Sequence, residues 1–165
     1  MKVDFYDENC QSDDIDHQLF GICDDENGER AYVSVDQDSQ WIARVMNPSQ
    51  LSMTFTAIDN CIAILRDNGE MENRCDGMLT YPNHIIFIEL KNQRTGGWIS
   101  NGLDQIETTI RHFMANHKLA DIKHKRAFVA NKRKLYFHVL DSVRKRHFFD
   151  KYRVRVHVGG DIKIA

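Results

Sequence analysis

The stretch His84-Ile85-Ile86-Phe87-Ile88-Glu89-Leu90-Lys91 decides the fold of this chain. Its apolar residues run without interruption from Ile85 to Ile88 and are β-branched or aromatic, which favours a strand buried on both faces. Glu89 and Lys91 follow two positions apart, so their side chains share one face of that strand. Charges at the end of a buried strand are costly unless they are paired or bound to a metal. The stretch therefore predicts a central strand with a polar site at its end.

A second acid is expected directly opposite this site. The segment Glu72–Tyr81 reads as the preceding strand, and a tight turn at Pro82-Asn83 would pair Tyr81 with His84 and, further along, Asp76 with Glu89. Side chains opposed in this way have Cβ atoms about 4.5–5.5 Å apart, where like charges repel. Two carboxylates are tolerated there if a divalent cation lies between them, and Mg²⁺ or Mn²⁺ takes such oxygen ligands. We therefore expect Asp76, Glu89 and the Leu90 carbonyl to bind the ion, with Lys91 beside it. The simpler interpretation of Glu89 and Lys91 is an ion pair at the strand edge.

The remaining patterns predict an α/β fold. A helix is expected from Ser100 or Asn101 to about His117, because Leu103, Ile106, Ile110, Phe113 and Met114 form an apolar stripe at helical spacing. The other expected elements are strands at Thr54–Ile58, Cys61–Arg66, Arg126–Asn131 and Tyr152–Val158, and a helix at Ser142–Phe149. This order is typical of a central mixed β-sheet flanked by helices.

Residues 1–50 differ in composition from the rest of the chain. They predict an acidic, β-rich extension with strands at His17–Cys23, Arg30–Val35 and Trp41–Met46. A length of 165 residues corresponds to one domain, so we expect 1–165 to fold as a unit with 51–165 as its core.

Composition excludes several classes of protein. The longest unbroken apolar run, Cys61–Leu65, is far short of the roughly 18 residues of a membrane span, so no membrane association is expected. No apolar segment follows Met1, which predicts no secretory signal. The four cysteines form no Cys-x-x-Cys pair, and we expect reduced thiols and a cytoplasmic protein.

Charge is distributed unevenly along the chain. Residues 1–76 contain 17 acidic and 5 basic residues, whereas residues 77–165 contain 7 acidic and 17 basic residues. A basic half of this kind predicts a polyanionic partner, although the two halves could instead attract each other within one globule. The candidate nucleic-acid-binding residues bracket one predicted strand and are Lys123, Lys125, Arg126, Lys132, Arg133 and Lys134. The alternative is that they form only a solvated rim.

Asp76, twelve residues, and then Glu89-Leu90-Lys91 resembles the signature of the PD-(D/E)XK nuclease superfamily. The resemblance covers about residues 54–131 and implies a restriction-endonuclease-like core. It implies Asp76 and Glu89 as ligands of Mg²⁺ or Mn²⁺ and Lys91 as the lysine that assists the attacking water. Many members carry a glutamine on the helix after the motif, and Gln105 matches it, although this side chain could simply face solvent.

The chain departs from the family pattern at two points. Cys75 stands where a proline is common, and no clear helix before the motif supplies a further acid. Asp59 and Glu72 are the candidates to replace that acid. The resemblance implies a metal-dependent nuclease that hydrolyses phosphodiester bonds and could act as a homodimer. DNA is the expected substrate, and RNA stays open. Two alternatives stay open: an inactive nucleic-acid- or protein-binding module of the same fold, and an acidic regulatory or immunity-type protein.

Overall fold

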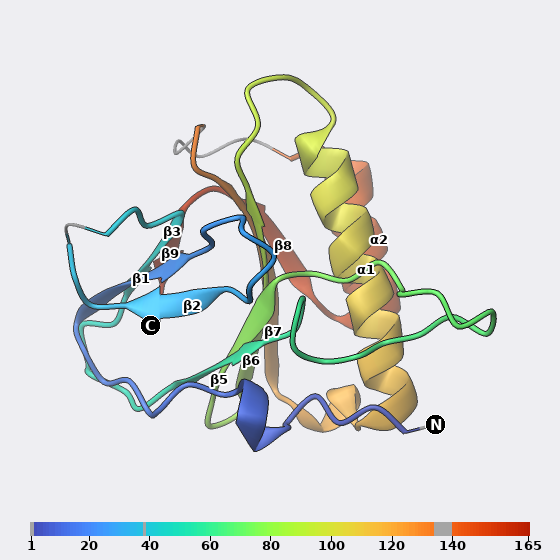
Figure 1. The fold of residues 1–165 in the computed structure, drawn as a ribbon, viewed down its shortest axis with the longest axis horizontal. Helices are drawn as coiled ribbons and strands as arrows, with labels where there is room; N and C mark the ends of the chain where they lie inside the picture. The colour runs from blue at the N-terminus through green and yellow to red at the C-terminus, as the bar shows by residue number, and fades with distance from the viewer. Residues whose placement is uncertain (1, 38, 134–139) are drawn as a thin grey trace.

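The computed structural model describes residues 2–37, 39–133 and 140–165 and contains two sheets and two α-helices within these ranges (Figure 1). The strands are β1 Leu19–Cys23, β2 Tyr32–Ser34, β3 Ala43–Met46, β4 Thr54–Ala57, β5 Gly77–Tyr81, β6 His84–Lys91, β7 His124–Asn131, β8 Arg155–Val158 and β9 Asp161–Lys163. The helices are α1 Trp98–Asn116 and α2 Ser142–Tyr152, and the 3-10 turns are η1 Glu8–Cys10 and η2 Leu119–Asp121.

The larger sheet is mixed and has the strand order β4-β5-β6-β7-β8. Strand β5 pairs antiparallel with β4 and with β6, and β7 pairs parallel with β6 and with β8. The predicted register of β5 and β6 is confirmed, because Tyr81 pairs with His84 and Gly77 with Ile88. The turn between them needs a left-handed residue, which Asn83 supplies with φ of 65°.

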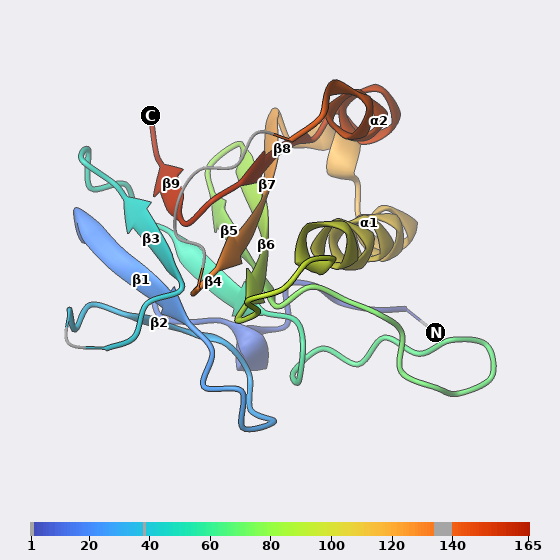
Figure 2. The ribbon, with the colours of Figure 1, turned by 90° about the horizontal axis from the view of Figure 1, so that it is seen from above.

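Two different layers cover the two faces of this sheet (Figure 2). Both described helices lie on one face, and the sheet of the N-terminal strands lies on the other. Alternate residues of β6 reach the two cores: Ile85 and Phe87 pack on the helix side, and Ile86 and Ile88 pack against the second sheet. The expectation of a central strand buried on both faces is confirmed, but a sheet takes the place of helices on one side.

The second sheet has the order β2-β1-β3-β9 and is also mixed. Its first three strands correspond to the strands predicted in residues 1–50, each somewhat shorter than expected. Strand β9, which pairs parallel with β3, comes from the other end of the chain and was not predicted. Ile162 of β9 is fully buried in the core between the sheets, so the end of the chain stabilises the acidic extension.

Several predicted elements differ from the structure. The strand expected at Glu72–Tyr81 begins only at Gly77. Cys61–Arg66 is not a strand: apart from one bridge between Leu65 and Met71, this segment forms a loop that projects beyond α1 (Figure 1). Ile62 and Ile64 of this segment are buried in the core on the helix side, whereas the polar tip around Gly69 is exposed. Helix α2 continues to Tyr152, which was assigned to a strand, and ends where Arg153 adopts φ of 60°. Helix α1 begins at Trp98, two residues before the predicted cap, because Gly97 turns the chain with φ of 90°.

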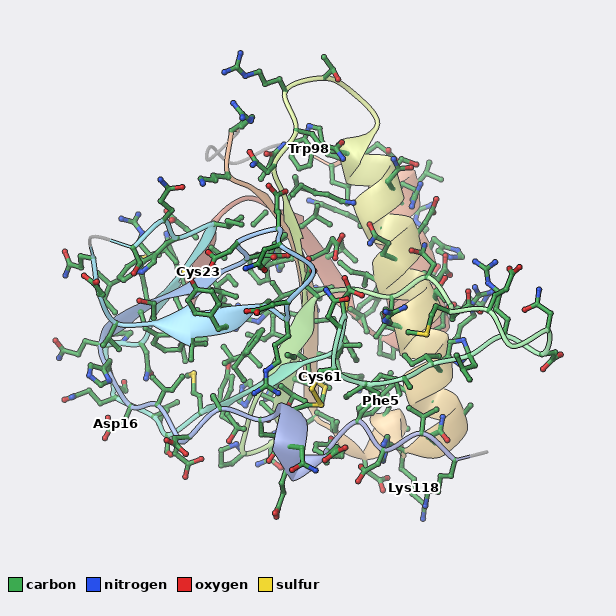
Figure 3. All side chains as sticks on the ribbon, in the orientation of Figure 1. Phe5, Asp16, Cys23, Cys61, Trp98 and Lys118 are labelled. Atoms are coloured by element: carbon green, nitrogen blue, oxygen red, sulfur yellow. A yellow bond between two sulfur atoms is a disulfide. The ribbon has the colours of Figure 1, made fainter. Side chains whose placement is uncertain are left out.

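The expectation of four reduced thiols is wrong for two of them. Cys10 and Cys61 form a disulfide, visible next to the Cys61 label in Figure 3, whereas Cys23 and Cys75 are free and buried. The turn η1 carries Cys10 to the beginning of the projecting loop, where the two Cα atoms lie 5.8 Å apart. This bond ties the N-terminal extension to the segment between β4 and β5. No helix within the described residues is long and apolar enough to cross a membrane.

We predict that reducing this disulfide destabilises the fold. It closes a loop over a sequence separation of 51 residues, and the lost restriction of the unfolded chain corresponds to about 4 kcal/mol. Urea unfolding with and without reductant measures the difference. The double variant Cys10→Ser, Cys61→Ser is the control, since its stability should match that of the reduced chain and should not respond to reductant. Equal stability of the oxidised and reduced wild type would contradict the prediction.

Candidate active site

The structure brings Asp76 and Glu89 together beside the end of β6. Both are buried, with 7% and 2% of their surface exposed. The amide of Asp76 donates to Glu89 Oε1 at 3.1 Å, and the amide of Leu90 donates to Asp76 Oδ2 at 2.7 Å. The two carboxyl groups lie close enough for each to shift the pKa of the other. Glu89 is therefore held by the backbone of Asp76, which directly precedes β5, and Asp76 is held by the backbone of β6.

Burial changes the protonation of this pair. The pKa of Asp76 lies well above its ordinary value, first because the group is desolvated and second because it faces the charge of Glu89. Desolvation also raises the pKa of Glu89, although Asp76 and Lys91 partly oppose that effect. Two buried carboxylates this close need a shared proton or a cation between them. The pair is thus a place where a metal ion can replace a proton.

Lys91 completes the group on the same face of β6. Its Nζ lies 3.1 Å from Glu89 Oε2 and donates to Gln105 Oε1 at 2.5 Å. Gln105 in turn donates through Nε2 to the carbonyl of Arg74 at 3.3 Å. The amine is held from two sides, so the ion pair that a Glu-x-Lys sequence suggests is present but forms part of a larger network. The solvent-facing alternative for Gln105 is wrong.

Close approach of α1 to the sheet makes the contact between Lys91 and Gln105 possible. A Cβ added at Gly102 would lie 2.8 Å from Val129 Cγ1 and 3.5 Å from Glu89 Cγ. The missing side chain therefore lets this turn of α1 lie directly on β6 and β7. Gln105 is three residues further along the same helix, on the side that reaches Lys91.

The expected third acid does not join the pair. Asp59 is bound to Arg74 at 2.9 Å, and Glu72 accepts from Arg66 at 3.1 Å and lies 3.3 Å from His112. Within the ranges that the structure describes, no group of three or more His, Cys, Asp or Glu side chains is arranged to hold a metal.

The acidic extension contributes to the site in a way that the sequence did not predict. The charge of Asp24 helps to raise the pKa of Asp76, and Glu26 Oε2 accepts from Asn92 Nδ2 at 2.9 Å. The turn between β1 and β2 therefore lies beside the carboxyl pair. The acidic run Asp24-Asp25-Glu26 was the only feature of the sequence that could have indicated this contribution, but such runs usually form solvated turns. Arg74 was also missed, because nothing in its sequence context links it to α1.

The predicted nucleic-acid-binding residues divide between two ends of the sheet. Lys132 and Arg133 directly follow β7, next to the candidate site, where they line a hollow of about 610 Å³ together with Asn92 and Arg94. Lys123, Lys125 and Arg126 lie at the opposite end, because β7 runs parallel to β6 and pairs Lys125 with Ile85 but Asn131 with Lys91. Lys134 lies outside the described residues. The six residues do not form one continuous track.

The donor set fits a hard divalent cation. Asp76 and Glu89 present carboxylate oxygens, and Mg²⁺ typically uses one or two carboxylates with water and substrate phosphate. Asn92 Oδ1, at the end of the same strand, is buried and has no hydrogen-bond partner among the described residues. The contact from Leu90 comes from its amide N–H, which orients Asp76, and not from the carbonyl expected as a ligand.

Comparison with known proteins identifies no relative. No protein-family model, curated protein or solved structure matches this chain. The case for its chemistry therefore depends on the residues of the site themselves.

We predict that Gly102→Val disrupts the network around Lys91. The new side chain would meet Val129 and Glu89 and push α1 away from the sheet, at a cost of about 1–3 kcal/mol. The measurements are urea unfolding and the magnesium response described below, and both should weaken. Gly96→Ala is the control, because nothing lies within 4 Å of an added Cβ there. A Gly102→Val variant as stable as Gly96→Ala would contradict the close approach.

Proposed function

We propose that this chain is a metal-dependent nuclease with a restriction-endonuclease-like core, which hydrolyses phosphodiester bonds in DNA. The observation that carries the proposal is the buried Asp76–Glu89 pair with the Lys91 amine 3.1 Å from Glu89. A pair of buried carboxyls destabilises a fold that has no use for them, since removing such charges commonly stabilises a protein. Their presence at the open end of a central strand favours a functional role.

Asp76 and Glu89 would hold Mg²⁺ or Mn²⁺, which when bound stabilises the negative charge that develops on a phosphate during hydrolysis. The chain's own residues position the other participants. Lys91, held by Glu89 and Gln105, presents an N–H to a water molecule and orients it toward the phosphorus atom. Gln105 is a positioning residue in this scheme, because it acts through Lys91.

The cations next to the site favour a phosphate-bearing substrate. Arg94, Lys132 and Arg133 line the hollow that follows the ends of β6 and β7. Contacts of this type fix the register of a nucleic acid and depend little on its sequence. DNA as substrate, a homodimer and a cytoplasmic location stay predictions, and the Cys10–Cys61 disulfide means that thiol content no longer supports the last of them.

A binding module of the same fold is the second candidate. The observation in its favour is that, in the described part of the chain, no third acid joins Asp76 and Glu89. A regulatory role for the acidic extension has support from the contact of Glu26 with Asn92, which places negative charge beside the hollow. In that case the extension would compete with phosphates for the same cations.

The nuclease proposal predicts metal-dependent cleavage of DNA by the purified chain. Supercoiled plasmid and single-stranded DNA are incubated with Mg²⁺, with Mn²⁺ or with chelator. Glu89→Gln and Lys91→Ala should each lower the rate by at least about 100-fold, because the first removes a ligand of the metal and the second removes the group that orients the water. Glu70→Gln and Lys118→Ala make similar changes at exposed positions and should leave the rate unchanged.

Two results would contradict the proposal. Cleavage that persists in Glu89→Gln and Lys91→Ala would come from another site or from a contaminant. Absence of cleavage of both DNA and RNA, together with retained DNA binding, would favour the binding module.

The carboxyl pair also predicts a pH-dependent stability without metal. Asp76→Asn removes one buried charge and keeps an acceptor for Leu90, so it should raise the free energy of unfolding by about 1–3 kcal/mol near neutral pH. Because the folded-state pKa values of the pair are raised, the wild type loses stability as pH rises above the unfolded value of about 4. The gain in the variant should therefore shrink at about pH 5. Urea unfolding in chelator at both pH values measures it.

Magnesium should reverse the difference in stability between Asp76→Asn and the wild type. Binding to the folded chain alone stabilises it in proportion to RT ln(1 + [Mg²⁺]/Kd), so Mg²⁺ should raise the stability of the wild type but not of Asp76→Asn. Glu70→Gln serves as the control and should respond like the wild type. A wild type that does not respond to Mg²⁺ or Mn²⁺ would argue against a metal site at Asp76 and Glu89.

A further inference from the structure

A cationic cavity of about 850 Å³ lies at the edge of the larger sheet opposite the candidate active site. It is formed where β6, β7 and β8 begin, whereas Glu89 and Lys91 lie near the end of β6. His84 and Glu89 are five residues apart on this strand, which corresponds to about 16 Å. The basic residues that line the cavity are Lys123, Lys125, Arg126, Arg153, Arg155 and Lys163.

These charges are held in place without being neutralised. Arg126 donates to the Lys163 carbonyl at 3.0 Å and to the Tyr81 hydroxyl at 3.3 Å, and Lys125 donates to the Ile122 carbonyl at 2.6 Å. These partners are neutral oxygens. Over the residues that the structure describes, none of the six cations forms an ion pair and no acidic side chain lines the cavity. So many unpaired like charges repel each other, and a bound polyanion would relieve that repulsion.

Stacked rings form one wall of the cavity. The rings of Tyr81 and His84 are 4.2 Å apart and nearly parallel, at 10°, and the rings of His84 and His124 are 4.5 Å apart at 23°. His124 is exposed and ends this stack. Desolvation and the nearby His84 and Lys123 lower its pKa, which favours the neutral ring. A further planar ring can stack on such a surface, as nucleobases do on aromatic side chains.

The other side of the cavity combines an aromatic ring with guanidinium groups. The guanidinium carbons of Arg153 and Arg155 lie 5.2 and 4.8 Å from the centre of the Phe149 ring. Both groups are thereby restrained, while the N–H donors at their edges stay available for phosphate oxygens. The volume falls within the range of small-ligand pockets, roughly 300–1,000 Å³.

We propose that this cavity is a nucleotide-binding site, separate from the Asp76–Glu89 site, that binds phosphates with its cations and a base on His124. The shared chemistry is a base joined to several phosphates. It can come from a free nucleoside polyphosphate or from a nucleotide within a single strand. Either ligand would bind without the metal ion of the candidate active site, so the two sites can be tested independently.

Calorimetric titration in chelator tests the proposal with three probes: adenosine triphosphate, inorganic triphosphate and a short single-stranded oligonucleotide. Lys123→Ala, Arg155→Ala removes two exposed cations of the cavity and should weaken binding of adenosine triphosphate at least about tenfold. Lys2→Ala, Lys118→Ala removes the same charge from exposed positions that do not line the cavity, and should bind within about twofold of wild type. Circular dichroism confirms that each variant is folded.

His124→Ala separates stacking from charge. It should weaken binding of adenosine triphosphate about fivefold or more, since stacking of one base contributes at least that much, and leave inorganic triphosphate within about twofold. Binding of the oligonucleotide but not of adenosine triphosphate, lost in the Lys123→Ala, Arg155→Ala variant, would support the site and identify a strand as its source. No binding of any probe, or equal binding by wild type and that variant, would overturn it. An equal effect of His124→Ala on both triphosphates would overturn the role of the base. None of these outcomes depends on whether the chain cleaves DNA.

Discussion

Burial of β6 on both faces is the constraint on which the rest of the structure depends. A strand whose alternate residues Ile85 and Ile86 are both fully buried needs a layer on each side of the sheet. The helices supply one layer, and the acidic extension with β9 supplies the other. The extension is therefore part of the core, although its charge suggests an appendage. Only the ends of β6 remain for polar groups, and both candidate sites lie there.

The same constraint explains the chemistry of the carboxyl pair. Glu89 continues the face of Ile85 and Phe87, so it points toward α1 and into a region with little water. In such a place two carboxyls interact strongly, and their proton affinity rises together. The backbone amides of Asp76 and Leu90 fix the geometry before any ligand arrives. In the metal site that we propose, the stability lost to the carboxyl pair would be the cost of holding a cation in a defined position, as is common at functional sites.

The features of the fold that depend on residues close together in the sequence could be predicted. The register of β5 and β6 follows from a tight turn, and the pattern of β6 follows from burial, so the proximity of Asp76 and Glu89 could be inferred. Contacts between segments that are far apart in the sequence could not be predicted. Strand β9 has only three residues and is a strand because β3 lies beside it, and Cys10 reaches Cys61 only through the packing of η1. The position of Gln105 next to Lys91 depends on how closely α1 approaches, which the missing side chain of Gly102 determines.

The direction of the strands explains why the predicted nucleic-acid-binding residues do not form one surface. Lys125 and Lys132 are close in sequence, but they lie near opposite ends of β7, and the parallel order of β6, β7 and β8 keeps the two ends of the sheet distinct. Cations at the beginning of these strands therefore gather with Arg155, whereas those after their ends gather beside Glu89. A basic half-chain is thus divided into two separate positive surfaces. The acidic turn at Glu26 contacts only the surface beside the carboxyl pair, and no acidic side chain among the described residues lines the far cavity. Attraction between the two halves of the chain can explain the first surface but not the second.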